Sequence, residues 1–184
     1  MSRRLVVVIG PSGAGKDSVL DGVRANWSFA KPAHFARRTI TRPVKSDDEQ
    51  HEAVDVASFE QMLQAQMFCM HWQANGISYG IRKTELDPIN IGQWVFINGS
   101  RAYLPKLLKA WPLATVVHIS AAHEVLAQRL AQRGRESGDA MVKRLSRNVA
   151  LNLPAHAISI DNNSTLEDAV SSLTRALKMR MQLA

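Results

Sequence analysis

The sequence predicts an α/β fold in which helices cover both faces of a central parallel sheet. Short apolar segments rich in β-branched residues alternate with longer segments in which apolar residues recur every three or four positions. That alternation is typical of parallel sheets. The first apolar segment, residues 5–9, runs directly into a glycine-rich turn that a helical pattern follows. A strand, a tight turn and a helix therefore open the chain.

Each expected strand is an apolar run suited to burial on both faces of a sheet. We place strands at residues 5–9, 36–40, 94–97, 114–119 and 157–160. The helical patterns between and after them cover residues 16–26, 57–67, 100–110, 122–133, 140–150 and 165–181. In the last of these, Ser164 and Glu167 have the spacing of a capping box. That helix is expected to cover the sheet.

The length and the apolar segments limit the class of protein. A chain of 184 residues fits one compact domain. No apolar segment is long enough to cross a membrane, and the first one ends at Ile9, so neither a membrane span nor a signal peptide is indicated. We expect a cytoplasmic protein with no membrane partner. Because Cys69 is the only cysteine, an internal disulfide and a thiolate zinc cluster are excluded.

The formal net charge of +7 fits either a nucleic-acid binder or an enzyme of phosphorylated small molecules. Much of the excess lies in one segment that contains no aromatic side chain on which a base could stack. The sequence therefore favours a phosphorylated small molecule and no nucleic-acid partner. The cations of this segment are Arg129, Arg133, Arg135, Lys143, Arg144 and Arg147.

The strongest motif is the turn after the first strand, where four residues separate Gly10 from Gly15 and Lys16 follows. This is the pattern of a phosphate-binding loop. Backbone N–H groups and the helix N-terminus would converge on the phosphates, and Lys16 would add a charge near the transferred group. The expected ligand is a nucleoside triphosphate. The residues predicted to bind it are Gly10, Pro11, Ser12, Gly13, Ala14, Gly15, Lys16, Asp17 and Ser18.

Asp17 stands where this motif normally supplies a Ser or Thr hydroxyl to magnesium. Magnesium prefers hard oxygen ligands and keeps several waters. Asp17 is therefore a candidate to hold Mg²⁺ directly or through water. The alternative is that Asp17 only favours the positive end of its helix, which is worth roughly 0.3 to 1 kcal/mol.

Four segments occur in a characteristic order: GPSGAGKD at 10–17, RRTITR at 37–42, HWQANGISYG at 71–80 and RLAQRGRES at 129–137. With them the chain resembles the guanylate kinase superfamily over nearly its full length. It is most similar to a bacterial branch that phosphorylates ribose 1,5-bisphosphate. The resemblance implies a three-layer P-loop kinase fold over residues 1–184, with a substrate-binding insertion at about 36–93 and a lid at about 129–147.

The departures from guanylate kinases concern guanine recognition. Those kinases resemble one another in having Ser and Glu where this chain has Arg38 and His71. In their protonated forms these two side chains cannot accept the N–H donors of guanine and favour anions instead. The next loop reads SDDEQHEAVD at 46–55, so it lacks a family tyrosine that grips the nucleoside monophosphate.

A further departure concerns magnesium. Guanylate kinases are similar in ending the strand after the insertion with an acid, whereas here that strand leads to Asn98. One carboxylate is lost near the phosphates, and Asp17 has appeared in the same pocket. We interpret the two changes as compensating.

The resemblance implies that the acceptor is a phosphate oxygen, which is anionic at neutral pH, so no general base is required. Catalysis would come from alignment and charge neutralisation. The catalytic candidates are Lys16, Arg129, Arg133 and Arg144, with Arg135 on the nucleotide. The acceptor would be bound by Arg38, Arg42, His71, Tyr79 and Arg101.

The expected activity is phosphorylation of ribose 1,5-bisphosphate to 5-phosphoribosyl 1-diphosphate, with ATP and Mg²⁺. The resemblance connects this activity with phosphonate metabolism. One alternative is a nucleoside monophosphate kinase, guanylate kinase included, and another is a non-catalytic guanylate-kinase-like binding module. Gly15, Lys16 and the lid arginines argue against the module, which needs none of them.

Overall fold

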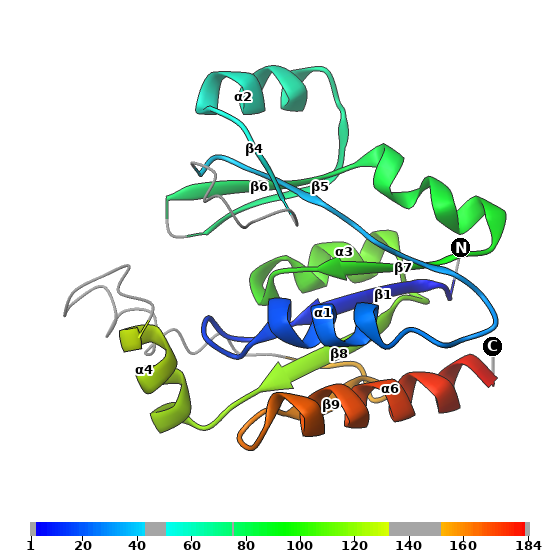
Figure 1. The fold of residues 1–184 in the computed structure, drawn as a ribbon. Coiled ribbons are helices and arrows are strands. Elements are labelled where there is room, and N and C mark those ends of the chain that lie inside the picture. The colour runs from blue at the N-terminus through cyan, green and yellow to red at the C-terminus, as the bar shows by residue number, and fades with distance from the viewer. Residues whose placement is uncertain (1–2, 43–50, 75, 133–151, 183–184) are drawn as a thin grey trace.

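The computed structural model describes residues 3–42, 51–74, 76–132 and 152–182. Its central sheet has the strand order β2-β7-β1-β8-β9 (Figure 1), and every pairing in it is parallel. The predicted α/β fold with a central parallel sheet is confirmed. The five strands are β1 (Leu5–Ile9), β2 (Ala33–Phe35), β7 (Trp94–Asn98), β8 (Thr115–Ser120) and β9 (Ile158–Asp161).

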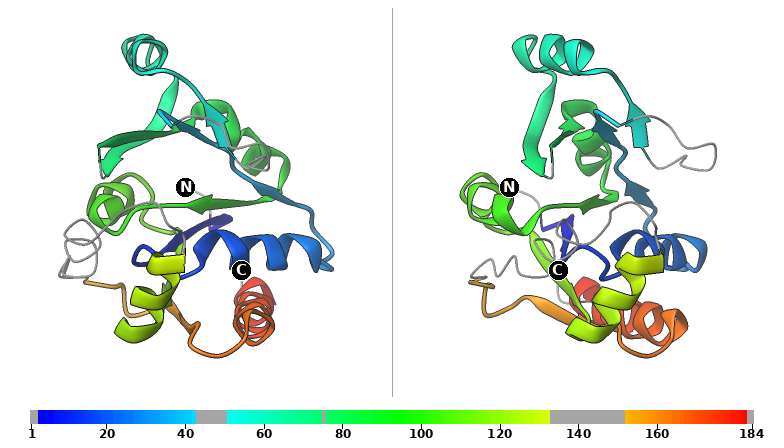
Figure 2. Two further views of the ribbon diagram at one scale, coloured as in Figure 1. Left: turned by 60° about the vertical axis from the view of Figure 1, so that its left-hand side comes forward. Right: turned by 90° about the vertical axis from the view of Figure 1, so that its left-hand side faces the viewer.

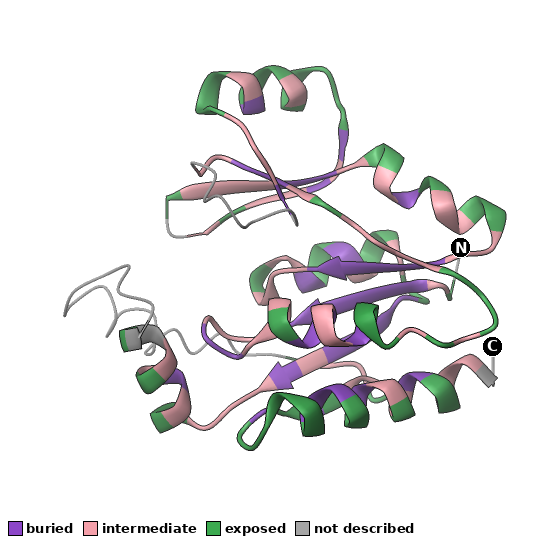
Figure 3. Ribbon diagram, viewed as in Figure 1, coloured by how far each residue is buried: buried purple, intermediate pink, exposed green. Residues whose placement is uncertain are grey.

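The central strand β1 is buried along its whole length because its side chains alternate between two apolar cores. Val6 and Val8 pack in the core on the side of α1 (Lys16–Ala25) and α6 (Leu166–Gln182). Val7 and Ile9 belong to the other core, which includes residues of α3 (Leu104–Ala110). Figure 3 shows this buried sheet between layers whose outer surfaces are exposed. Helix α4 (His123–Gln132) follows β8.

A second, mixed sheet lies above the core in Figures 1 and 2. Its strand order is β4-β3-β6-β5. Helix α2 (Val56–Gln64) packs against it through Phe59, whose ring stacks 4.8 Å from that of Phe68. Met70 and Ile81 join the core that the two sheets share. The strands are β3 (Arg38–Ile40), β4 (His51–Ala53), β5 (Phe68–Ala74) and β6 (Ile77–Arg82).

Two short 3₁₀ segments connect these parts. Segment η1 (Lys83–Ile91) leads from the second sheet back to β7, and η2 (Arg101–Tyr103) joins β7 to α3. Glu85 of η1 ties the connection down, because its Oε2 lies 2.6 Å from His34 Nε2 and accepts the Arg37 N–H at 2.9 Å. Within the described part of the chain, no helix is long and apolar enough to cross a membrane.

The predicted strand 36–40 is wrong as a member of the parallel sheet. The parallel sheet takes β2 instead, which pairs with β7, whereas β3 pairs with β4 and β6 in the second sheet. The chain leaves the central sheet at Ala36, whose N–H donates to Phe96 O at 2.9 Å. Strands of three residues bury too little to give a clear periodic pattern.

The cap of α6 is Thr165 and not Ser164, because the Thr165 Oγ1 accepts the Asp168 N–H at 3.1 Å. The capping residue therefore lies one position later than predicted. The helix predicted at 140–150 lies outside the described residues.

Candidate active site

The phosphate loop joins β1 to α1 and requires glycine at three positions. Gly13 and Gly15 have φ of 88° and 85°, a left-handed conformation that glycine adopts without steric cost. A Cβ on Gly10 would lie 2.2 Å from the Ile119 carbonyl oxygen, so only glycine lets the loop pass this close to β8. Among the described residues no side chain caps the first turn of α1. The positive end of α1 therefore faces the loop, where an anion would bind.

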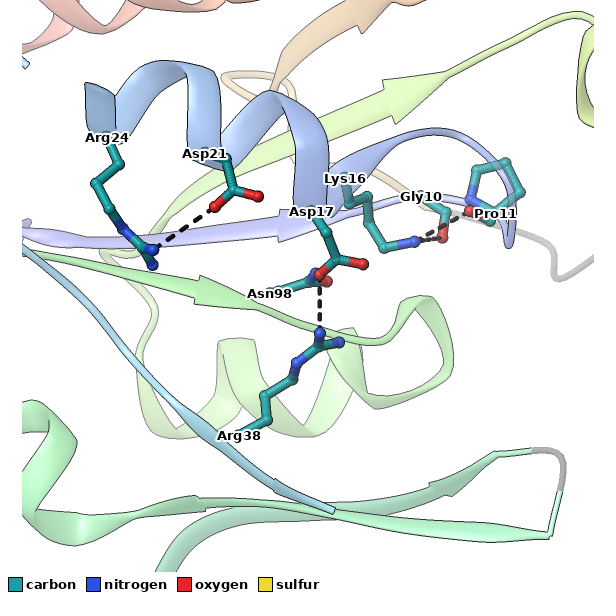
Figure 4. Close-up of polar contacts among 8 residues, drawn as sticks. All are labelled: Gly10, Pro11, Lys16, Asp17, Asp21, Arg24, Arg38 and Asn98. Atoms are coloured by element: carbon teal, nitrogen blue, oxygen red, sulfur yellow. Dashed lines mark hydrogen bonds and ion pairs between the residues drawn. The ribbon is translucent and has the colours of Figure 1, made fainter. Parts of the chain in front are cut away.

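Lys16 folds back over this loop (Figure 4). Its Nζ donates to the carbonyl oxygens of Gly10 at 3.1 Å and Pro11 at 3.0 Å. These two hydrogen bonds hold the ammonium group at the loop. A bound phosphate would offer it charged acceptors, which make stronger hydrogen bonds than neutral carbonyls.

Asn162, which directly follows β9, and Arg129 of α4 approach the same loop. Asn162 is 2% exposed, and its Nδ2 donates to the Ala14 carbonyl at 2.8 Å. The Arg129 Nη1 would lie 3.9 Å from a Cβ on Gly15 and, among the residues that the structure describes, has no hydrogen-bond partner. A buried guanidinium donor beside a phosphate loop is suited to a phosphate oxygen.

The remaining lid arginines of the prediction, Arg133, Arg135 and Arg144, lie outside the described residues.

Asp17 connects the core to the second sheet (Figure 4). Its Oδ1 accepts a hydrogen bond from Arg38 Nη2 of β3 at 2.8 Å and another from Asn98 Nδ2 of β7 at 2.5 Å. The Arg38 side chain is 17% exposed and that of Asp17 is 49% exposed. The two predicted residues, Asp17 of α1 and Arg38 of β3, therefore meet at one point.

This contact lines a small pocket at the carboxyl end of the central sheet. Two guanidinium groups and a single carboxylate give the pocket an excess of positive charge, which suits a phosphorylated ligand. The lining residues are Asp17, Leu20, Arg24, Phe35, Ala36, Arg38, Phe96 and Asn98.

Two of the predicted acceptor residues, Arg38 and Tyr79, lie on neighbouring strands of the second sheet. Arg38 pairs with Ile81, and Tyr79 pairs with Ile40 and stacks on Trp72 with ring centroids 5.5 Å apart. Since side chains alternate along a strand, Arg38 and Tyr79 lie on one face.

His71 pairs with Gly80, so the register places it on the opposite face. Burial, and then the charge of Lys106, lowers the pKa of His71, which favours the neutral imidazole. The structure does not bring His71 beside Arg38. The predicted residue Arg42 follows β3, just after the hydrogen bonds between Thr41 and Ser78.

Arg101 begins η2, beyond the carboxyl end of β7. His118 lies near it on β8, opposite Ile9 and therefore one residue from the phosphate loop. Burial and then the charges of Arg101 and Lys16 lower the pKa of His118. His118 could not be identified from the sequence, because it lies inside an apolar run, where a single histidine carries no motif.

The environment of His118 predicts an acid-sensitive stability. Its pKa is lower in the folded than in the unfolded chain, where it is about 6.5. Its contribution to stability is therefore complete above that value and is lost as the pH falls below it. Replacing His118 with Gln should reduce the loss of unfolding free energy between pH 7.5 and pH 5.5, measured by urea titration. His123→Gln, at an exposed position, should leave that loss unchanged. An equal loss in both variants would contradict this account.

A family model described as guanylate kinase matches residues 2–180. The chain belongs to the guanylate kinase family. Among solved structures, the guanylate kinase from Anaplasma phagocytophilum superimposes with a TM-score of 0.65 at 14% identity. The superposition covers 96% of this chain and 85% of that one. At that identity the likeness shows the fold alone.

Within the family, the chain is similar to proteins named ribose 1,5-bisphosphate phosphokinase PhnN. It is 39% identical to the one from Agrobacterium fabrum (strain C58), over 95% of this chain and 96% of that protein. It is 44% identical to the one from Janthinobacterium sp. (strain Marseille), over 96% of this chain but 39% of that protein. A bifunctional ribose 1,5-bisphosphokinase-thymidine phosphorylase from Cupriavidus pinatubonensis is 41% identical over 94% of this chain and 29% of its own length. The chain thus spans less than half of two of these relatives.

Proposed function

We propose that the protein is an ATP-dependent kinase that phosphorylates ribose 1,5-bisphosphate to 5-phosphoribosyl 1-diphosphate. The observation that carries this proposal is the ion pair between Arg38 and Asp17. It places the Arg38 cation of the second sheet at the first turn of the phosphate-loop helix. Guanylate kinases resemble one another in having a neutral serine at the position of Arg38. A compact anionic acceptor fits that site better than a purine. The names of the relatives support the same substrate.

On the donor side, the loop and Lys16 would hold the phosphates of ATP, with Arg129 on the transferred group. The predicted lid residues Arg133, Arg135 and Arg144 would add charge when the lid at about 129–147 closes. The positive charges oppose the charge that spreads over the phosphoryl oxygens during transfer. No proton needs to be removed from the acceptor, because its C1 phosphate is already ionised.

On the acceptor side, the insertion at about 36–93 would present Arg38, Arg42 and Tyr79 to the sugar bisphosphate. Arg101, at the carboxyl end of β7, would bind a phosphate between the two substrates. Such a position follows the general rule that α/β proteins bind ligands at the carboxyl ends of their strands. His71 stays a predicted contact of the acceptor, and the register of β5 places it on the opposite face of the sheet from Arg38 and Tyr79.

Asp17 fits a magnesium ion of the kind that phosphate-transfer enzymes use. Mg²⁺ in such sites keeps several waters and takes one or two carboxylates beside the substrate phosphates. Asp17 supplies one half-exposed carboxylate beside Lys16. The described residues contain no larger cluster of metal-binding side chains. When bound, the ion would neutralise phosphate charge.

Replacing Asp17 with Asn should raise the Mg²⁺ concentration needed for half-maximal activity more than it raises the KM for ATP at saturating Mg²⁺. The reason is that the amide lacks the negative charge that holds the ion or its waters. A Mg²⁺ titration of activity measures the change. Asp21→Asn removes an acid one turn later on α1 and should leave the titration unchanged. An unchanged titration for Asp17→Asn would show that Asp17 serves only its helix and its ion pair.

The proposed function is tested by measuring ADP release with ATP and Mg²⁺ against four acceptors: ribose 1,5-bisphosphate, GMP, AMP and UMP. The sugar bisphosphate should be the preferred acceptor by a wide margin. Preferential use of GMP would instead make the protein a guanylate kinase. If the protein released no ADP with any of these acceptors, the kinase assignment would be contradicted.

A further inference from the structure

Asn98, at the carboxyl end of β7, has a hydrogen-bonding group that the proposed mechanism does not use. The side chain is 6% exposed and lines the pocket beside Asp17 and Arg38. Its Nδ2 donates to Asp17, whereas its Oδ1 is buried and accepts no hydrogen bond from the described residues. Buried polar atoms without partners are rare in folded proteins and call for an explanation.

The orientation of this amide follows from its neighbour. An ionised carboxylate can only accept hydrogen bonds, so the amide NH₂ must face Asp17, and the reversed orientation would set two oxygens against each other. Asp17 therefore fixes Asn98 with its Oδ1 directed elsewhere. A ligand bound in the pocket that Asn98 lines would supply a donor to that oxygen.

We propose that Asn98 is a specificity-determining residue whose Oδ1 accepts a hydrogen bond from a hydroxyl group of the acceptor sugar. This inference rests on the proposed function. At neutral pH the phosphates of ribose 1,5-bisphosphate have few protons to donate, whereas its C2 and C3 hydroxyls are donors. Arg38, in the same pocket, carries the charge that would hold an adjacent phosphate.

A metal-bound water is the other O–H donor that such a site could receive. The charged carboxylate of Asp17 attracts the cation more strongly than a neutral amide oxygen does. Asn98 is also more deeply buried than Asp17, and it reaches the pocket from the core side. The sugar hydroxyl is therefore the donor that we assign to Asn98, and the water is an outcome that the experiment distinguishes.

The test compares Asn98→Ala with the unmodified protein on three acceptors: ribose 1,5-bisphosphate and its 2-deoxy and 3-deoxy analogues. With the ribose compound, kcat/KM should fall by roughly tenfold, mainly through KM, which is the factor expected for one hydrogen bond. With the analogue that lacks the bound hydroxyl, the same substitution should cause less than about a twofold loss, because the contact is already missing.

Two further variants make the result decisive. Asn98→Ser disturbs the packing less and should show the same dependence on the hydroxyl if the alanine variant folds poorly. Thr115→Val, which changes a buried polar residue at the other end of the central sheet, should lose no preference among the sugars.

Equal losses on all three acceptors would overturn the inference. That result would favour the metal-bound water as the donor. If the unmodified protein used none of the sugar bisphosphates, the proposed function would fail and the inference with it.

Discussion

Lys16→Ala should lower kcat by roughly 10³-fold while the protein stays folded, because the missing cation acts on the charge of the transferring group. Lys16 donates hydrogen bonds to the Gly10 and Pro11 carbonyls of the loop. Losing those bonds should cost about 1 kcal/mol of stability, which thermal unfolding can measure separately. Single-turnover kinetics with saturating ATP would show the loss in the chemical step.

The matched control for this substitution is Lys178→Ala, which removes the same charge from an exposed position on α6. It should leave kcat unchanged, because charge far from the reacting groups is screened by salt. Near-normal turnover in folded Lys16→Ala would contradict the assignment of the loop to catalysis.

The largest expected effect concerns the choice of acceptor. GMP should be used roughly 10⁴-fold less efficiently than ribose 1,5-bisphosphate, since polar groups that lack their partners can discriminate to that extent. Replacing Arg38 with Ser and His71 with Glu should weaken use of the sugar bisphosphate without a full switch to GMP. A tyrosine that guanylate kinases use for the monophosphate is missing, so two substitutions leave the nucleotide site incomplete.

The two single variants should contribute unequally to the loss of activity with the sugar bisphosphate. Arg38→Ser should account for most of the loss, because Arg38 lies in the pocket with Asp17 and Asn98. His71→Glu should have a small effect, because the register places His71 on the other face of the sheet. Arg38→Lys keeps the charge and should recover part of the activity. A larger loss for His71→Glu than for Arg38→Ser, in kcat/KM for the sugar bisphosphate, would show that this account of the two positions is wrong.

The elements that carry long apolar runs or glycine motifs could be predicted from the sequence. The first strand, its loop and the start of α1 at Lys16 follow from burial on both faces of β1 and from the left-handed glycines. Strands of three residues such as β2 and β4 have no such pattern. The hairpin of β5 and β6 was not predicted. The sequence does contain an Asn-Gly pair at 75 and 76 between two segments in which apolar and polar residues alternate, a pattern that favours a tight turn.

The site could be predicted only in part. The loop residues are contiguous and share a motif, so the sequence identifies them together. The contact of Arg38 with Asp17 joins the second sheet to helix α1, and only the tertiary arrangement creates it. The sequence shows Asn98 only as the replacement of a carboxylate. The tertiary arrangement makes its side chain a hydrogen-bond donor to Asp17. Side chains alternate between the two faces along β5, so His71 and Arg38 lie on opposite faces of the second sheet. That conclusion needs the register of the β5–β6 hairpin, which the structure supplies.

The most direct test of the proposed activity is to follow the phosphorus resonances of a mixture of protein, ATP, Mg²⁺ and ribose 1,5-bisphosphate. We expect the C1 monophosphate signal to be replaced by the pair of coupled signals of a C1 diphosphate, with ADP formed in equal amount and the C5 phosphate unchanged. An unchanged C1 phosphate, while the same preparation converts GMP to GDP, would contradict the account.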